Sequence, residues 1–470
     1  MFCLYSDIPQ HLQVDPAVSA VLPVPPDVAP PRFWRGVLRH VGFRRVWLGA
    51  MVSSIGTWME GLGVQWLMAE QTGSTVMLGA LAAAQLGPML IFGLLGGLAA
   101  DRFDRRRMLL VTQMAMMVIA VLLTVAAALG RATPPVLIGL GLLNGIAMAF
   151  NIPAWQVLIP RLVPRDELHR AIALQGMQFN LARVVGPALA GLLLARTSAT
   201  VLFAINAISF VAVLSAIFAT SRAPPPTGPH APLVRQIAEA FAFVFKHPGA
   251  RALFTMLLLF SAFAAPIQRM LPLFVSDVFH SDEASYGLLL GLFGAGAVLG
   301  GLSLGRWPLW YPRHHLIPLS LTLTGACMTL FCATDSLALG GLWMAVTGLV
   351  WIWAFSSTMT ALQLLVGDAM RGRVLAVVNM AMFGAMPLGS MLAALLGERL
   401  AHVRSAVDSA PLLPGTAVQL GVGVMSAALT LCGVFLMIFR TPEIDEPTPT
   451  LPRSRNIWHG LTAARHRPAP

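Results

Sequence analysis

Two charged residues stand inside long apolar stretches, and their side chains are the first candidates for chemistry. Glu60 interrupts the run 46–69, and Arg183 interrupts the run 170–195. If both runs are helices, each charge lies about 13 residues, or about 20 Å, from the start of its helix. A carboxylate at that depth can couple proton binding to conformation, with the arginine tuning its proton affinity. The same placement fits a permanent buried ion pair, and the sequence leaves both interpretations open.

Polar, aromatic and thioether side chains near these charges are candidates to line a cavity. Amide and indole groups in an apolar setting orient ligands, and methionine gives a deformable wall. The candidates are Trp58, Gln65, Asn151, Gln178, Asn180 and Met386. Core filling is the alternative role for the methionine.

A third charge, Arg269, interrupts the run 251–275 near its second end. Asp277 follows two turns later and is expected to compensate it. We expect a role in topology or gating for this arginine, because an unpaired charge inside a membrane is costly.

The chain that positions these residues is too apolar for a water-soluble domain. Of its 470 residues, 57% are hydrophobic and 11% are charged, and the mean hydropathy is +0.74. The apolar runs are continuous rather than alternating, which excludes a transmembrane barrel and predicts an all-α membrane protein. Twelve spans are predicted at 46–69, 76–100, 108–130, 136–160, 170–195, 198–219, 251–275, 286–305, 315–334, 338–364, 374–397 and 416–439.

Positive charges indicate how these helices are oriented. Most of the 31 Lys and Arg residues fall in the terminal segments and in alternate connections. The positive-inside rule therefore places both termini in the cytoplasm, and the first 35 residues lack the apolar core of a cleavable signal peptide. We expect a multi-pass protein of a bacterial inner membrane. The net charge of +11 reflects this topology, so nucleic-acid binding is not expected.

The spans divide into two sets of six, separated by a proline-rich connection. The expected segments are a tail at 1–43, a half at 44–220, a linker at 221–250, a half at 251–440 and a tail at 441–470. An amphipathic stretch from Leu233 to Phe245 predicts a helix at the membrane surface within the linker. The run that starts at Arg170 resembles the run that starts at Arg373, which indicates duplication of a six-helix unit. Chance similarity between apolar helices is the alternative.

The connection after the second span carries an ordered set of Gly, Asp and Arg residues. Its gating-loop candidates are Gly97, Asp101, Arg102, Arg105 and Arg106. The spacing resembles the signature loop of the major facilitator superfamily, except that Asp104 stands where the family has glycine. The resemblance implies that Asp101 pairs with the opposite half and that the arginines form a charge network. An ordinary positive-inside loop is the alternative.

Glycine and proline in the fifth span form a second motif, with Gly186, Pro187 and Gly191 as its core. It resembles the Gly-Pro motif of exporters in this superfamily. Glycines allow close backbone approach and a proline kinks a helix, which suits a helix between two moving halves. An ordinary small-residue helix interface is the alternative.

Several further segments resemble the enterobactin-exporter-like branch of the superfamily, also described as transmembrane secretion effectors. They include 54–59, 151–156, 180–187 and 386–390, and the resemblance extends from about Phe43 to Arg440. It implies twelve helices in the major facilitator fold, as two pseudo-symmetric halves. It also implies a proton-driven exporter of small, partly lipophilic molecules, such as siderophores or drugs, that works by alternating access. A lysophospholipid or amphiphile flippase and a non-transporting sensor or scaffold are the alternatives.

Enzymatic chemistry finds no support in the sequence. No phosphate-binding Gly-rich loop, nucleophile elbow or metal-ligand motif is present. The cysteines, Cys3, Cys327, Cys332 and Cys432, lack metal-ligand spacing. We therefore expect no cofactor and no metal, and a monomer whose partners are a small-molecule substrate, protons and the lipid bilayer.

Overall fold

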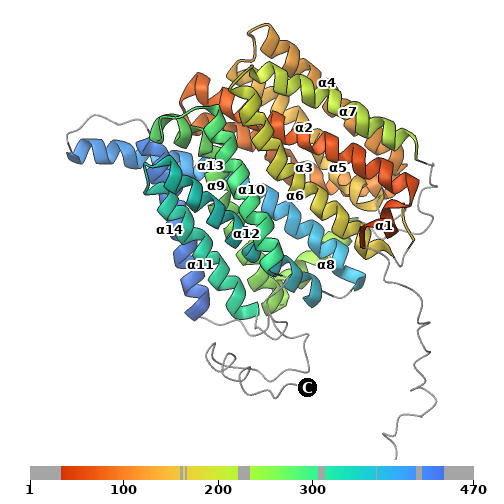
Figure 1. Cartoon of the computed structure of the whole chain (residues 1–470). Coiled ribbons are helices and arrows are strands. Elements are labelled where there is room, and N and C mark those ends of the chain that lie inside the picture. The colour runs from red at the N-terminus through yellow and green to blue at the C-terminus, as the bar shows by residue number, and fades with distance from the viewer. Residues whose placement is uncertain are drawn as a thin grey trace, which may run out of the picture.

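A computed structural model describes residues 33–158, 162–164, 167–220, 233–304, 313–366, 368–408 and 415–438. The described chain is helical, and Figure 1 shows long helices packed side by side in one bundle. The helices are α1 (Phe33–Leu38), α2 (Val41–Thr72), α3 (Thr75–Arg102), α4 (Arg105–Ala128), α5 (Pro134–Leu158), α6 (Leu168–Leu194), α7 (Ala199–Phe218), α8 (Leu233–Lys246), α9 (Pro248–Leu273), α10 (Glu283–Leu304), α11 (Arg313–Cys332), α12 (Leu337–Leu365), α13 (Asp368–Asp408) and α14 (Thr416–Ile438).

Eleven helices of the described chain are long and apolar enough to cross a membrane. The twelfth, α2, is 32 residues long and packs against α6 and α7. Glu60 and several serine, threonine and glycine residues make its middle less apolar. The predicted all-α fold with twelve spanning helices is thus confirmed.

The spanning helices form two sets that meet along two seams. Helices α2 to α7 pack mainly among themselves, as do α9 to α14. The sets meet where α3 packs on α13 and where α6 packs on α10. Helix α1 precedes α2, and helix α8 precedes α9. Because six spanning helices, an even number, lie between α1 and α8, both short helices lie at the same end of the bundle. We call this the α8 end. A residue on one of the seams is therefore placed to sense the relative position of the two sets.

Glycine every seven residues brings α2 against α7. Gly49, Gly56 and Gly63 lie on one face of α2, because seven residues are close to two helical turns. A Cβ on Gly56 would lie 2.5 Å from the Ser209 Oγ and 2.8 Å from the Asn206 Oδ1. The missing side chains thus allow α7 to present polar groups directly to the middle of α2.

Three helices extend well beyond the predicted spans, and the first is α2, at Val41–Thr72 rather than 46–69. Helix α13 spans Asp368–Asp408 rather than 374–397. Its end continues past Glu398 and Arg399 because charged residues with good helix propensity can extend a helix beyond the apolar layer. Helix α9 continues into a π-helical turn, Phe274–Val278, whereas the predicted span ended at 275. The predicted amphipathic helix of the linker is α8.

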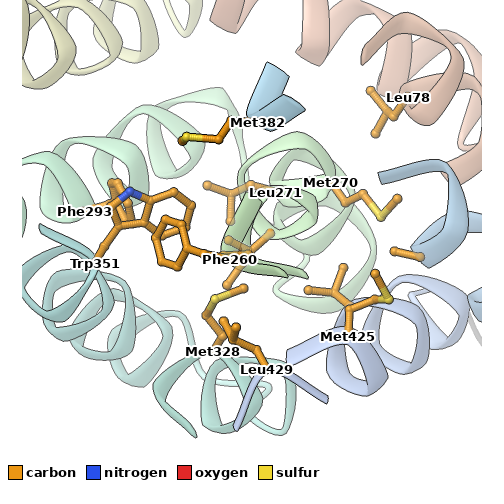
Figure 2. Close-up of a cluster of buried hydrophobic side chains, with 14 of the residues drawn as sticks. Leu78, Phe260, Met270, Leu271, Phe293, Met328, Trp351, Met382, Met425 and Leu429 are labelled. Carbon is orange, nitrogen blue, oxygen red and sulfur yellow. The ribbon is translucent and has the colours of Figure 1, made fainter. Parts of the chain in front are cut away.

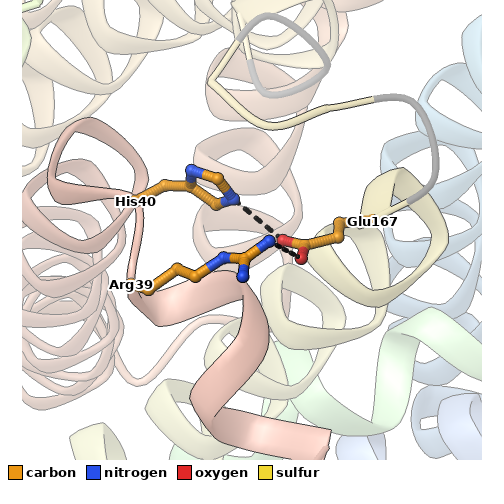
Figure 3. A network of polar contacts seen from close by, with 3 residues as sticks. All are labelled: Arg39, His40 and Glu167. Atoms are coloured by element: carbon orange, nitrogen blue, oxygen red, sulfur yellow. Dashed lines mark hydrogen bonds and ion pairs between the residues drawn. The ribbon is translucent and has the colours of Figure 1, made fainter. Parts of the chain in front are cut away.

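Ion pairs join each short helix at the α8 end to the start of a helix that packs on the opposite set. The first joins the end of α1 to α6, and the second joins α8 to α13. Figure 3 shows Arg39 and His40, which follow α1, converging on Glu167 at the start of α6. The Arg39 Nη2 lies 2.7 Å and the His40 Nε2 lies 2.9 Å from a Glu167 carboxylate oxygen. In the second set, Arg373 of α13 pairs with Glu239 of α8 at 3.1 Å. The charges are reversed between the two sets, but the attachment is the same.

We expect Glu167→Gln to destabilise the protein more than Glu239→Gln does. The Glu167 side chain is only 8% exposed and has two partners, so loss of its charge should cost about 1 kcal/mol or more. Glu239 is 43% exposed, and surface pairs contribute little. Apparent melting temperatures of the two variants in detergent would test this. Equal shifts would contradict it.

The second set carries a large apolar core. Figure 2 shows Phe260, Phe293 and Trp351 together beside methionine and leucine side chains. The Trp351 ring lies 4.5 Å from that of Phe260 and 5.4 Å from that of Phe293, both in edge-to-face geometry. This packing fixes the rings of Phe293 and Trp351 beside the inter-set seam, where they face the first set.

Candidate functional site

Glu60 is held by a neighbouring helix of its own set. The Asn206 Nδ2 of α7 donates a hydrogen bond of 2.6 Å to the Glu60 Oε2. The Asn206 Oδ1 in turn accepts from the Ser209 hydroxyl at 3.3 Å. The Glu60 side chain is partly exposed, and Gly61 beside it faces open space. The site is therefore a partly exposed carboxylate that accepts a hydrogen bond from one neutral donor.

Arg183 lies at the seam between the two sets. Its Nη2 donates a hydrogen bond of 3.2 Å to the Gln268 Oε1, on α9 of the other set. Its guanidinium carbon lies 4.9 Å from the Phe293 ring centre, 5.8 Å from that of Trp58 and 6.0 Å from that of Trp351. Aromatic faces attract a cation, so they partly offset its desolvation. Four helices thus surround one arginine.

The predicted pair between Glu60 and Arg183 is not formed in this conformation. Glu60 bonds to Asn206 and Arg183 bonds to Gln268, and among the described residues no carboxylate pairs with Arg183. A permanent ion pair therefore does not describe this structure. The two residues occupy adjacent helices, because α2 packs on α6, but their side chains serve different neighbours.

Arg269 crosses the other seam. Its Nη1 donates a hydrogen bond of 3.1 Å to the Gln85 Oε1 of α3. The expected compensation by Asp277 is wrong, because that carboxylate instead accepts from the Ser276 hydroxyl at 2.6 Å. Gln268 and Arg269 are consecutive, so one turn of α9 holds both α6 and α3 of the opposite set.

The Gly-Pro motif of α6 lies at its crossings with two helices. A Cβ on Gly186 would lie 2.5 Å from the Trp58 Cβ of α2. A Cβ on Gly191 would lie 2.7 Å from the Gly287 Cα of α10, and one on Gly287 would lie 2.8 Å from the Pro187 carbonyl oxygen. These glycines therefore allow backbone contact within the first set and across the seam.

Four of the six candidate cavity residues are partly exposed: Trp58, Gln65, Asn180 and Met386. The other two are buried inside the first set. Asn151 is 3% exposed and donates to the Thr112 hydroxyl at 2.8 Å, so it joins α5 to α4. Gln178 is 5% exposed and donates to the Ala50 carbonyl and the Ser54 hydroxyl, so it joins α6 to α2. In this structure both are helix-packing residues rather than cavity residues.

The candidate gating loop is described only in part. The side chains of Asp101, Arg102 and Arg105 lie outside the described residues, and Gly97 faces open space. Arg106 donates to the Ile217 and Phe218 carbonyls at the end of α7.

Asp104, the departure from the superfamily pattern, caps α4. Its carboxylate accepts from the backbone N–H groups of Arg106 and Arg107 at 2.9 and 3.3 Å. An aspartate at this position thus accepts hydrogen bonds from two N–H groups at the start of the helix. Glycine has no side-chain acceptor and could not do this.

A cavity of about 330 Å³ opens at the end of the bundle opposite α8. Its wall includes Trp66, Glu70, Gln71, Thr197 and Glu283. Beside it, the Trp66 ring stacks on the buried Tyr286 ring of α10 at 5.9 Å. This cavity is separate from the surroundings of Arg183.

The sequence reasoning missed the partners that hold both charges. Asn206, Gln268 and Gln85 are amides inside apolar spans, and Phe293 and Trp351 are rings of the second set. Intramembrane amides are costly unless paired, so each was a detectable candidate. Their pairing with Glu60 or with an arginine depends on helix rotation, which the sequence does not show.

Solved structures of transporters share this architecture. A bacterial homologue of the human lysosomal transporter Spinster, in an inward-facing and occupied conformation, matches with a TM-score of 0.66 and 13% identity over 85% of this chain and 95% of that one. A D-xylose–proton symporter matches with a TM-score of 0.65 and 16% identity, over 86% and 98%. This likeness shows that the two packed six-helix sets have the major facilitator fold.

Proteins of similar sequence show to which family within this fold the chain belongs. The chain is 26% identical to a staphyloferrin A transporter of Staphylococcus aureus over 356 residues, which are 75% of this chain and 88% of the relative. It is also 26% identical to macrolide efflux protein A of Streptococcus pyogenes, over 76% and 90%, and to an enterobactin exporter of Escherichia coli, over 71% and 80%. Residues 35–434 match the transmembrane secretion effector family, and the chain belongs to that family.

Proposed function

We propose that this chain is a proton-driven exporter of small, partly lipophilic molecules, of the siderophore or drug type. It works as a monomer in a bacterial inner membrane, with both termini and the α8 end in the cytoplasm. The observation that carries the proton coupling is Glu60. It is a partly exposed carboxylate within a spanning helix, and its partner among the described residues is the neutral amide of Asn206.

Protonation of Glu60 changes which hydrogen-bond partners its carboxyl group needs. The carboxylate accepts a hydrogen bond from Asn206, whereas the protonated acid also carries a donor that needs an acceptor. Because α2 packs on both α7 and α6, a new partner for Glu60 alters how α2 meets the helix that carries Arg183. Proton binding then favours one position of the two sets over another.

Alternating access is supported by where the two sets touch. Along α6, Val184 meets Gly294 of α10 near the middle of both helices, and Gly191 meets Gly287 toward the end opposite α8. Along α3, Gly79 meets the Met391 backbone near the same end. Toward the α8 end, Gly93 and Gly97 of α3 and Gly176 of α6 face open space. Closed contacts at one end and space at the other suit a protein that opens to each side in turn.

The test uses everted membrane vesicles with an imposed proton gradient. Catecholate and carboxylate siderophores, macrolides, cationic dyes and lysophospholipids are added in turn while a pH-sensitive dye records the gradient. Dissipation by siderophores or drugs, absent from vesicles lacking the protein, supports proton antiport. Response only to lysophospholipids would point to an amphiphile flippase instead. No response, from vesicles that contain folded protein, would point to a sensor or scaffold without flux.

A further inference from the structure

The seams between the two sets carry positive charge without a matching negative one. Arg183 and Arg269 both lie within spanning helices, and each bonds to a glutamine oxygen of the opposite set. Among the described residues, neither has a carboxylate partner. The acid within the adjacent helix α2, Glu60, is bonded to Asn206. Two cations inside a membrane with neutral partners leave a strong attraction for an anion.

Arg183 also has unused donors. A guanidinium carries five N–H donors in a planar fork, and the described contacts use one of them, toward Gln268. The fork can bind an oxyanion in a bidentate manner without displacing that bond. The partly exposed position of Arg183 leaves room for this contact.

Aromatic faces lie around that arginine on both sides of the seam. Trp58 comes from the first set, whereas Phe293 and Trp351 come from the second. Phe179, one turn before Arg183 toward the α8 end, meets the Trp58 ring at 6.0 Å and is 53% exposed. Phe293 and Trp351 are buried, whereas Trp58 and Phe179 offer stacking surface next to the charge, on the side from which a cytoplasmic substrate would enter.

We propose that the exported molecule is an anion, with a carboxylate or phenolate bound by Arg183 and a flat aromatic body stacked against Trp58 and Phe179. This inference rests on the proposed export function and names its substrate class. The oxyanion supplies the negative charge that the protein lacks at this seam. A cationic molecule of the same shape is repelled there. Because Arg183 also bonds to Gln268 of the second set, binding of the anion also changes how strongly the two sets are held together.

The test is calorimetric binding to the purified full chain with a matched set of probes. Salicylate and salicylamide differ in one charged group, and benzylammonium reverses the charge. We expect salicylate to bind about ten- to hundredfold more tightly than salicylamide, because a hydrogen bond to a charged group is worth about 1.5 to 3 kcal/mol. Benzylammonium should bind more weakly than either. Equal affinities for the acid and the amide would overturn the proposal.

Variants assign the preference to Arg183. Arg183→Gln should remove the difference between acid and amide, whereas Arg131→Gln, in an exposed connection, should keep it. If size-exclusion chromatography shows that Arg183→Gln does not fold, Arg183→Lys replaces it. Lysine keeps the charge but lacks the fork, so the preference should shrink. A preference unchanged in the variant would overturn the assignment.

The outcome is separable from that of the export test. Acid preference without proton movement in vesicles would retain the anion site and reject the proposed antiport. Proton-coupled flux of neutral or cationic compounds, unaffected by Arg183→Gln, would retain antiport and reject the anion site.

Discussion

Replacement of Glu60 by glutamine is expected to abolish substrate-dependent dissipation of the proton gradient, down to the level of vesicles without the protein. Glutamine has the same shape, and its carbonyl oxygen can still accept the Asn206 hydrogen bond. The variant therefore keeps the contact between α2 and α7 but cannot bind and release a proton. Substrate binding, measured by calorimetry on the purified variant, should survive. This separation of binding from proton movement is the signature of a proton carrier.

The matched control for this prediction is Glu70→Gln on the same helix. Glu70 is exposed and lines the cavity at the end opposite α8. Its loss should leave proton coupling intact, because that carboxylate lies outside the Glu60 and Asn206 site. Unchanged dissipation in Glu60→Gln would make Glu60 a structural residue and move proton coupling elsewhere. Loss of coupling in both variants would argue against one proton carrier at Glu60.

The second large effect, on stability and transport, is expected from Gly191→Ala, which adds one carbon atom at the seam between α6 and α10. In Gly191→Ala the new Cβ would lie 2.7 Å from the Gly287 Cα and 3.0 Å from the Glu283 carbonyl oxygen. Because these are backbone atoms, α6 and α10 must separate by about 1 Å to restore ordinary contact. Overpacking of this kind costs about 1 to 3 kcal/mol. We expect a lower apparent melting temperature and strongly reduced transport, because this crossing holds the two sets together.

Gly176→Ala is the matched control, on the same helix with the same change. Nothing lies within 4 Å of a Cβ at that position. The substitution should be neutral or slightly stabilising, because alanine favours a helix over glycine by about 1 kcal/mol. Thermal unfolding in detergent would be measured for both variants, and transport in vesicles for Gly191→Ala. Equal behaviour would show that the Gly191 crossing does not control the seam.

The two seams explain why single residues have such effects in this protein. Gln268 and Arg269, on one turn of α9, hold α6 and α3 of the opposite set through Arg183 and Gln85. A change at either partner is transmitted through a rigid helix rather than through a flexible loop. Each of these hydrogen bonds joins a charged group to a neutral amide, and such a bond contributes about 1.5 to 3 kcal/mol.

Much of this protein follows from the sequence alone. Length and hydropathy require spanning helices, because lipid offers no partner for an unpaired backbone. The linker helix α8 is visible in the sequence because its apolar residues recur at helical spacing. The family is also visible, because the segments around Asp101, Asn151 and Pro187 keep the order and spacing of a transmembrane secretion effector.

Only the tertiary structure decided which residues meet. The sequence placed Glu60 and Arg183 at one depth, but their rotation about the helix axes directs Glu60 to Asn206 and Arg183 to Gln268. The packing of the helices also buries Asn151 and Gln178 between helices of the first set. Depth follows from position along a helix, and the sequence gives position. The direction in which a side chain points depends on how the twelve helices pack together. Long-range contacts, such as that of Gly191 with Gly287, set this packing.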